Sequence, residues 1–566
     1  MKTFLLGLLV FFLAACGEAG TPETSEFTVF MNATVYTGVE NGDNAEAVVT
    51  NGNRIVFVGS ETAALELAPN ARMVNLNGAF MYPGFSDGHA HLLGIGQREL
   101  VLNLEGSISV ADVQERLRAY AEIVPEGENI VGRGWIETHW PEGRFLTRED
   151  IDAVVPDRPV YLGRSDGHAA TLNTAALEML GIDENTPVPD GGEILRNEKG
   201  ELTGVIIDAA KEGPESFFYS ALNERRAEAY DGSSQFLASH GWTQIHNMWD
   251  TQEALDLMET ASDEGWLKVR VYNSLQGFIP GSGPNPSVYE FLKSGARVNQ
   301  NGKVITRAIK LYMDGALGSR GALLLEPYSD ADTKGLLLAD EDIYLDIMGK
   351  ALRAGIQVNI HAIGDGGNRL LLDWVQETFE AVPAEEWGNP DPRWRDEHTQ
   401  IVNPEDIPRF AELGVIPSMQ PSHAIGDLYF APDRLGKDRL VGAYAWRSLI
   451  EAGSIIVGGS DAPVERGDPR IEFYAAVARK SLDGFSNEDW HPEEAVTRAE
   501  ALKMFTIWPA YAAFQEKDLG TIEVGKLADF TVFSADIMTI PEADILTVEV
   551  IMTIVDGEIV YENPGS

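Results

Sequence analysis

Apolar and polar positions alternate in short runs at both ends of the chain. Between residues 27 and 82 the runs are FTVFMNATVYT, AEAVVTNGNRIVFVG and ARMVNLNGAFMYP, and Gly and Asn interrupt them as in hairpins. The runs DFTVFSA and TVEVIMTIVDGEIVYE near the C-terminus have the same character. The economical interpretation is one small β domain built from residues 27–82 and 511–566.

The middle of the chain repeats a strand-like apolar run followed by a helix-like stretch. Eight such runs lie near 80–91, 241–248, 268–275, 304–314, 356–363, 396–402, 414–420 and 454–461. Helical patterns fall between most of them, for example over 342–354, 367–381 and 404–413. Eight strands alternating with helices predict an α/β fold, a (β/α)8 TIM barrel, over residues 83–510. The gap after the first run is too long for one loop, so residues from about 105 to 238 are expected to form an inserted subdomain.

The N-terminus carries a basic residue, Lys2, and then an apolar run over residues 4–15. This run is too short to span a bilayer as a helix, which needs about 20 residues, and it is typical of a secretory signal. It ends in LAAC, which resembles a bacterial lipoprotein box with Cys16 as the lipidated residue. We therefore expect a signal peptide over 1–15, a tether over 16–26 and an exported, membrane-anchored lipoprotein, periplasmic or outer-membrane in a Gram-negative cell. The alternative is an ordinary signal peptide with an incidental cysteine.

Composition narrows the classes of function. The chain has 566 residues, with Lys+Arg 43 against Asp+Glu 88 and a net charge of −45. This balance argues against a nucleic-acid binder and against attachment to anionic lipid by basic patches, so membrane contact is expected only through the lipid anchor. Cys16 is the only cysteine, which excludes intrachain disulfides and Cys-based zinc sites. The expected partner is a small-molecule substrate.

The strongest chemical signal is the motif PGFSDGHAH, which contains His89 and His91. Residues two apart on a strand face the same side, so these two imidazoles can bind one divalent metal. Residues with similar chemistry stand in or at the ends of other predicted strands, and the C-terminal strand ends of a barrel converge on one mouth. These residues are Lys310, His361, His398 and Asp461.

Several motifs resemble those of the metal-dependent amidohydrolase superfamily. They are PGFSDGHAH, RSDGHAATLNTAAL, IKLYMDGALGSRGA, HAIGD, EHTQ, GGSDAPV and GKLADFTVF, and the similarity runs from about residue 27 to 562. The branch concerned is amidohydrolase family 3, which includes N-substituted formamide deformylase. The resemblance implies a metal-bearing barrel with a β-sandwich. It also implies a hydrolase that attacks a carbon–nitrogen bond other than a peptide bond (amide, formamide or cyclic amide) with a metal-activated water.

The resemblance also assigns roles to the candidate ligands. His89 and His91 would bind the more buried metal together with Asp461, and His361 and His398 would bind a second metal. Asp461 would in addition be the catalytic residue that takes a proton from the attacking water and passes it to the leaving nitrogen. The expected cofactor is a divalent metal, with zinc as the first choice, at one or two ions per chain.

Lys310 is the expected bridge between the two metals. Burial and nearby cations favour a neutral lysine amine, and a neutral amine can add CO2 to give an anionic carbamate ligand. The alternative interpretations are structural. Lys310 could be a lysine extending to solvent at a strand edge, His398 could be an ion-pair partner on the surface, and Asp461 could cap a turn.

Three further residues are candidates for substrate binding. His168 belongs to the RSDGHAA segment of the inserted region and is expected to reach over the site. His423 follows the seventh strand run and is expected in the pocket. Arg320 follows the fourth run and could bind a substrate carboxylate bidentately, with a structural salt bridge as the alternative.

Other functions remain open at this stage. A mononuclear, deaminase-type site could use His89, His91, His361 and Asp461, and a metal-dependent dipeptidase would share the same site architecture. A barrel that has kept its ligands but lost activity is a further possibility. A function of another class is a non-catalytic solute-binding lipoprotein, although such a protein has no need of six metal-type residues at strand ends.

Overall fold

The computed structural model describes residues 27–40, 42–137, 140–165, 169–189, 192–279 and 283–565. The expected signal peptide, the tether, Cys16 and His168 lie outside the described residues. Within the described ranges, no helix is both long enough and apolar enough to cross a membrane.

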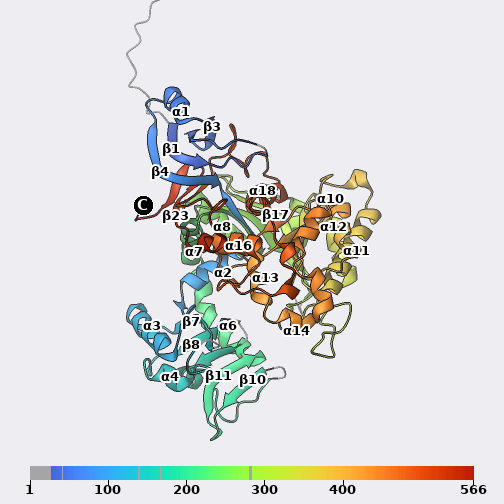
Figure 1. Ribbon diagram of the computed structural model, residues 1–566. Helices are drawn as coiled ribbons and strands as arrows, with labels where there is room; N and C mark the ends of the chain where they lie inside the picture. The colour runs from blue at the N-terminus through green and yellow to red at the C-terminus, as the bar shows by residue number, and fades with distance from the viewer. Residues whose placement is uncertain are drawn as a thin grey trace, which may run out of the picture.

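Eight parallel strands form a nearly closed barrel at the centre of the molecule (Figure 1). In order around the barrel they are β5 (Phe85–Ala90), β12 (Trp242–Asp250), β13 (Arg270–Gln276), β17 (Val304–Tyr312), β18 (Gln357–Ala362), β19 (Arg395–His398), β20 (Ile416–Met419) and β21 (Val457–Gly458). Each of the eight predicted runs overlaps one of these strands, so the prediction of a (β/α)8 barrel is confirmed.

The helices around the barrel have apolar faces and clear ends. In α10 (Glu341–Ala354), the side chain of Asp340 accepts the N–H of Ile343 at the start, and Gly355 ends the helix with φ 67°. The other described α-helices between the strands from β12 to β21 are α8 (Gln252–Asp263), α9 (Pro286–Ser294), α11 (Asp365–Ala381), α12 (Ile407–Leu413), α13 (Pro421–Asp427), α14 (Ala431–Leu435) and α15 (Trp446–Glu451), and α16 (Pro469–Ala478) follows β21. Their buried faces contribute to one large core shared with the barrel.

A second sheet is inserted after the first barrel strand and lies below the barrel in Figure 1. Its order is β10 (Gly192–Arg196), β11 (Leu202–Asp208), β9 (Ala169–Leu172), β8 (Val160–Arg164), β7 (Ile130–Trp135) and β6 (Leu102–Asn103). The helices α3 (Val110–Ile123), α4 (Arg148–Asp152), α5 (Thr174–Leu180) and α6 (Ala209–Asn223) accompany it. Two apolar clusters of its own stabilise it, so the expected insertion after strand 1 is present.

Two helices connect this insertion to the barrel. The chain leaves through α2 (Leu92–Glu99) and returns through α7 (Arg226–His240), and these helices pack against each other. Their contact requires glycine, because a Cβ at Gly96 would lie 1.8 Å from the backbone oxygen of Ala229. The insertion is therefore joined to the barrel beside β5, the strand that carries the HAH motif.

The first and last strands of the described residues meet in one β domain at the top of Figure 1. Its single, continuous sheet has the order β24 (Glu558–Glu562), β23 (Val550–Val555), β22 (Phe530–Phe533), β4 (Arg72–Pro83), β1 (Phe27–Val35), β2 (Ala47–Asn51) and β3 (Arg54–Gly59). The central strand β4 pairs with β1 on one side and β22 on the other. The helix α1 (Glu61–Leu67) packs on one face. The prediction of one β domain from both termini is confirmed, but among the described residues its strands form this one sheet and not the two facing sheets of the expected β-sandwich.

A buried ion pair joins the β domain to the barrel. Arg270, at the start of β13, places Nε 2.6 Å from Oδ2 of Asp529, and its Nη2 lies 2.6 Å from Oδ1 of Asp556. Since Arg270 lies at the N-terminal end of its strand, the β domain covers the end of the barrel opposite the C-terminal mouth.

The barrel closes where β5 meets the segment after β21. The carboxylate of Asp87 accepts the N–H groups of His89 (3.2 Å) and Ser460 (2.9 Å) and also the Ser460 hydroxyl. Further along the same two segments, the N–H of Asp461 donates to the carbonyl of His89 at 2.6 Å, and the N–H of His91 donates to the carbonyl of Ala462 at 2.8 Å. The first and last strands thus fix one another through residues that neighbour the candidate ligands.

Candidate metal centre

A cavity of about 1000 Å³ opens at the C-terminal ends of the barrel strands. Its wall brings together side chains that are far apart in sequence, such as His89 and Asp461 with a separation of 372 residues (461 − 89 = 372). All of the predicted site residues that the structure describes line this cavity: His89, His91, Lys310, Arg320, His361, His398, His423 and Asp461.

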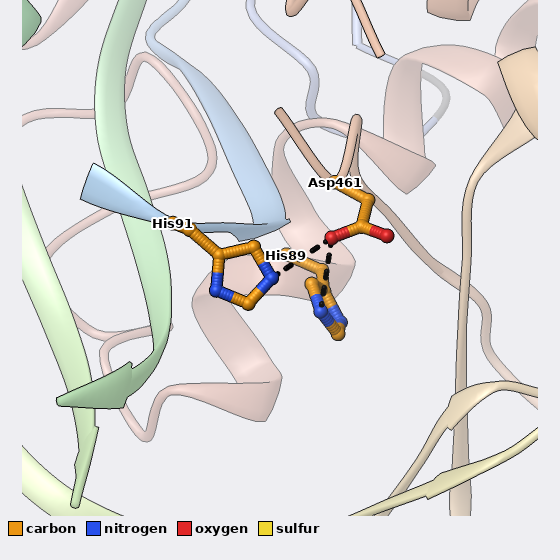
Figure 2. Close-up of side chains that lie close together, drawn as sticks. All are labelled: His89, His91 and Asp461. Atoms are coloured by element: carbon orange, nitrogen blue, oxygen red, sulfur yellow. Dashed lines mark hydrogen bonds and ion pairs between the residues drawn. The ribbon is translucent and has the colours of Figure 1, made fainter. Parts of the chain in front are cut away.

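Three of these residues form the tightest cluster (Figure 2). Nε2 of His91 lies 3.0 Å from Oδ1 of Asp461, and Nε2 of His89 lies 3.6 Å from the same oxygen. The three candidate ligand atoms all lie within 4.8 Å of one another. Both rings point toward the carboxylate, so a single ion could contact all three side chains.

The orientation of the imidazole rings is set by hydrogen bonds at Nδ1. An acceptor oxygen faces Nδ1 in three of the rings, which places the hydrogen on Nδ1 and leaves the lone pair of Nε2 free. The pairs are His89 with Glu397 Oε2 (2.6 Å), His91 with Met248 O (2.9 Å) and His398 with Gln420 Oε1 (2.8 Å). These three residues therefore present the nitrogen that a metal requires.

The other predicted ligands lie next to this cluster. The ring centroid of His398 is 4.7 Å from that of His89 and 4.6 Å from that of His361. Lys310 comes from β17 and is 1% exposed. Nζ of Lys310 and Nε2 of His361 are buried without a hydrogen-bond partner among the described residues.

Burial controls the charge states of these groups. It lowers the pKa of His89 to about 4 and of His361 to about 3, and in both cases the charge of Lys310 adds to the effect. It also lowers the pKa of Lys310 to about 8. Burial alone would raise the pKa of Asp461, but the close approach of His91 Nε2, at 3.0 Å, and the other imidazoles hold it well below its usual value. His89 and His361 are therefore neutral imidazoles near an ionised carboxylate.

The chemistry of these donors fits a divalent metal. Nε2 of His89, Nε2 of His361 and Nζ of Lys310 are buried and unpartnered within the part of the chain that is described. A buried polar atom without a partner costs free energy, and a ligand that satisfies several of them at once removes that cost. Imidazole nitrogen with carboxylate oxygen is a donor set that zinc and similar metals prefer.

His423 differs from the ligand-type histidines. Its Nδ1 lies 3.1 Å from the amide nitrogen of Gln400, which donates, so the ring hydrogen belongs on Nε2. That Nε2 is 3.6 Å from Oδ2 of Asp461 and faces the cavity. His423 can therefore donate a hydrogen bond to a bound molecule, although its position also allows a ligand group with His398 and Asp461.

Arg320 lines the cavity but is engaged within the protein. Its Nε and Nη2 donate to the two carboxylate oxygens of Asp330 at 3.0 and 2.8 Å. Arg434 pairs with the same carboxylate. The salt bridge considered from the sequence is thus present, and a role of Arg320 in substrate binding stays a prediction.

The residues that orient the histidines were not predicted from the sequence. Glu397 directly precedes His398 and had no predicted role, yet it is 0% exposed and contacts His89. The spacing of Arg395 and Glu397 was the available signal, because residues two apart on a strand share one face. Gln420 and Gln400 gave no comparable signal, since they follow the strands in irregular turns.

Comparison with known proteins agrees with this geometry. The model of the amidohydrolase family named Amidohydro_3 matches residues 72–561. The chain belongs to this amidohydrolase family. It is 33% identical over 546 residues to the amidohydrolase YtcJ of Bacillus subtilis, covering 93% of this chain and 98% of YtcJ. It is 28% identical over 554 residues to N-substituted formamide deformylase of Arthrobacter pascens, covering 95% and 99% of the two chains.

A solved structure with the same fold is a metal-dependent hydrolase from Pyrococcus horikoshii OT3. It aligns with a TM-score of 0.73 and 25% identity, covering 91% of this chain and 99% of that one. The family and this likeness identify the protein as a metal-dependent amidohydrolase, an enzyme that acts on carbon–nitrogen bonds. The prediction from the sequence motifs is confirmed at this level.

Proposed function

We propose that this amidohydrolase cleaves a carbon–nitrogen bond in an amide, formamide or cyclic amide, with one or two divalent metals held at the barrel mouth. The observation that carries the proposal is the cluster of His89, His91 and Asp461, whose ligand atoms lie within 4.8 Å of one another. The similarity to a formamide deformylase along almost the whole chain supports N-substituted formamides as the first substrates to test.

The candidate ligands would provide two metal positions. His89, His91 and Asp461 would hold the inner metal, and His361 with His398 would hold the outer one. Zinc is the first choice of metal for this donor set. A bound divalent metal supplies Lewis acidity, which polarises a carbonyl group and makes water a stronger nucleophile at neutral pH.

Lys310 would connect the two positions as a carbamate. Its burial and lowered pKa favour the neutral amine, the form that reacts with CO2. Nζ forms a bond to the carbon of CO2 and releases one proton, which leaves an anionic carboxylate at the end of the side chain. Unpartnered Nζ lies among the candidate ligands, which supports this assignment.

Proton transfer would be the task of Asp461. Its carboxylate is ionised and faces the cavity, so it can accept a proton from the attacking water and deliver it to the leaving nitrogen. His423 would donate from Nε2 to the carbonyl oxygen of the substrate. His168 and Arg320 complete the proposed substrate-binding residues.

The test combines metal analysis with hydrolysis of a panel of N-substituted formamides, simple amides and cyclic amides. We expect about two metals per chain in the wild type and loss of one metal and of activity in Lys310→Ala. Formate or another short carboxylate should partly restore that variant. Unchanged activity in Lys310→Ala would eliminate the bridge, and a wild-type metal count near one would favour the mononuclear arrangement.

Export as a lipoprotein is a separate proposal that rests on the sequence LAAC at residues 13–16. Cleavage before Cys16 and lipid attachment to its thiol would anchor the enzyme to a membrane surface. Metabolic labelling with a fatty acid in a bacterial host tests this. Label should enter the wild type and be absent from Cys16→Ser, and equal labelling of both would refute the anchor.

A further inference from the structure

A fully buried ion pair lies beneath the metal cavity, in the interior of the barrel. Arg395 and Glu397 are both 0% exposed and stand two residues apart on β19. Nε of Arg395 is 2.8 Å from Oε1 of Glu397, and Nη2 donates to Oε2 at 3.2 Å. A buried pair of this kind often contributes little net stability compared with apolar residues of similar volume, so its presence calls for another role.

The carboxylate of this pair meets the first histidine of the HAH motif. Oε2 of Glu397 is 2.6 Å from Nδ1 of His89. An ionised carboxylate can only accept, so Nδ1 must carry the hydrogen and Nε2 must present its lone pair. That Nε2 is buried, has no hydrogen-bond partner among the described residues and lies 3.6 Å from Asp461.

Arg395 fixes the carboxylate by binding three other strands of the barrel. Its Nη2 donates to the carbonyl of Gly88 on β5 and to the hydroxyl of Ser418 on β20, both at 2.6 Å. Its Nη1 donates to Nδ1 of His246 on β12 at 2.8 Å. Because the guanidinium is held on several sides, it leaves Glu397 little freedom to turn away from His89.

In the other ligand-type histidines, Nδ1 donates its hydrogen bond to a neutral acceptor. His91 donates to a main-chain carbonyl at 2.9 Å, and His398 donates to a side-chain amide oxygen at 2.8 Å. A hydrogen bond to an ionised acceptor is shorter and stronger than one between neutral groups. It also makes the opposite ring nitrogen a better metal ligand. Among these three histidines, His89 is thus the one whose Nδ1 donates to an ionised carboxylate.

We propose that Arg395 and Glu397 are positioning residues for the inner metal, in which Glu397 fixes the tautomer and ring orientation of His89 and Arg395 holds Glu397 in place. The inference rests on the proposed role of His89 as a metal ligand. It assigns to this pair the affinity of the inner metal position rather than contact with the substrate.

The decisive variant is Glu397→Gln, which keeps the shape of the side chain and removes its charge. Its matched control is Asp529→Asn, because Asp529 is also a buried carboxylate paired with an arginine, Arg270, at the opposite end of the barrel. Zinc affinity is measured by competition with a chromophoric chelator, and folding is checked by circular dichroism. We expect zinc binding about 10–100-fold weaker in Glu397→Gln and unchanged in Asp529→Asn.

A second readout reports on the tautomer directly. In metal-free protein labelled with 15N-histidine, the ring nitrogens of His89 should give the Nδ1–H pattern in the wild type and a mixture of tautomers in Glu397→Gln. The signal of His89 is assigned by its loss in His89→Ala. If Glu397→Gln does not fold, Glu397→Asp serves instead, because its shorter side chain cannot reach His89 and should weaken zinc binding in the same range.

Three results would overturn the proposal. They are wild-type zinc affinity in a folded Glu397 variant, an equal loss of affinity in Asp529→Asn, and an unchanged His89 tautomer in Glu397→Gln. A wild-type protein that binds no metal would be a different failure. It would refute the proposed metal site itself, and the inference with it.

Discussion

The barrel closes at a seam between β5 (Phe85–Ala90) and β21 (Val457–Gly458), and Gly88 lies in this seam. We predict that Gly88→Ala weakens metal binding by pushing the two strands apart. A Cβ built on Gly88 would lie 2.2 Å from Cγ1 of Val457 and 2.5 Å from the backbone oxygen of Gly458. Carbon atoms pack best at about 3.5–4.0 Å, so the added methyl group overlaps both neighbours. Val457 could turn its side chain, but the oxygen of Gly458 belongs to the backbone. The two strands must therefore separate by roughly 1 Å to reach an ordinary contact distance.

A separation of this size acts directly on the metal centre. His89 follows Gly88 on one side of the seam, and Asp461 follows Gly458 by three residues on the other. Metal–ligand distances tolerate changes of about 0.2 Å, so an opening of about 1 Å is roughly five times that limit. We expect zinc affinity to fall by at least about tenfold, together with an overpacking cost of about 1–3 kcal/mol.

The assay measures zinc retained after dialysis against a chelator, together with thermal unfolding. Gly163→Ala is the matched control, because Gly163 also lies in a strand and its added Cβ would come no closer than 3.6 Å to any neighbour. The control should keep the metal content of the wild type. Full zinc retention in Gly88→Ala would show that the seam can widen without disturbing the ligands, and the reasoning would be wrong.

Three further predictions concern other parts of the enzyme. His423→Ala should lower kcat by about 100-fold with metal content unchanged, because His423 donates a hydrogen bond rather than binding metal; loss of a metal would make it a ligand. Chelation should abolish hydrolysis and added zinc should restore it, so activity in metal-free protein would contradict the proposed chemistry. The hydrogen bond from Arg447 lowers the pKa of Glu500 from 4.5 to about 2. This pair therefore stabilises the fold above about pH 4.5 and loses that effect as the pH falls toward 2. The difference in thermal midpoint between wild type and Glu500→Gln should shrink over this range, and a constant difference would refute the assignment.

The sequence allowed the barrel to be predicted because eight strand-like runs alternate with helical patterns, although one of the strands, β19 (Arg395–His398), is polar. The ligands could be predicted for a related reason. Strand ends of a barrel meet at one mouth, so His89 and Asp461 could be placed together from their positions in the pattern alone. The β domain could be predicted equally well, because apolar and polar residues alternate clearly in its strands near both ends of the chain.

The residues that orient the candidate ligands could not be predicted from the sequence in the same way. Glu397 and Arg395 are charged residues, which are rarely buried, and a single sequence favours a surface position for them. Their burial depends on β5, β12 and β20 lying around them, which is a property of the closed barrel. The bidentate salt bridge of Arg320 with Asp330 likewise depends on the path of a loop, which local patterns do not determine.

The position of the seam also has a consequence for how the enzyme is made. On the ribosome, the histidines of the HAH motif leave the exit tunnel long before Asp461, from which 372 residues separate His89 (461 − 89 = 372). At about 5–20 residues per second, this delay lasts roughly 20–75 s. A nascent chain thus has the two imidazoles without Asp461 throughout that interval, and the proposed inner metal position can be complete only after translation has passed the last barrel strand.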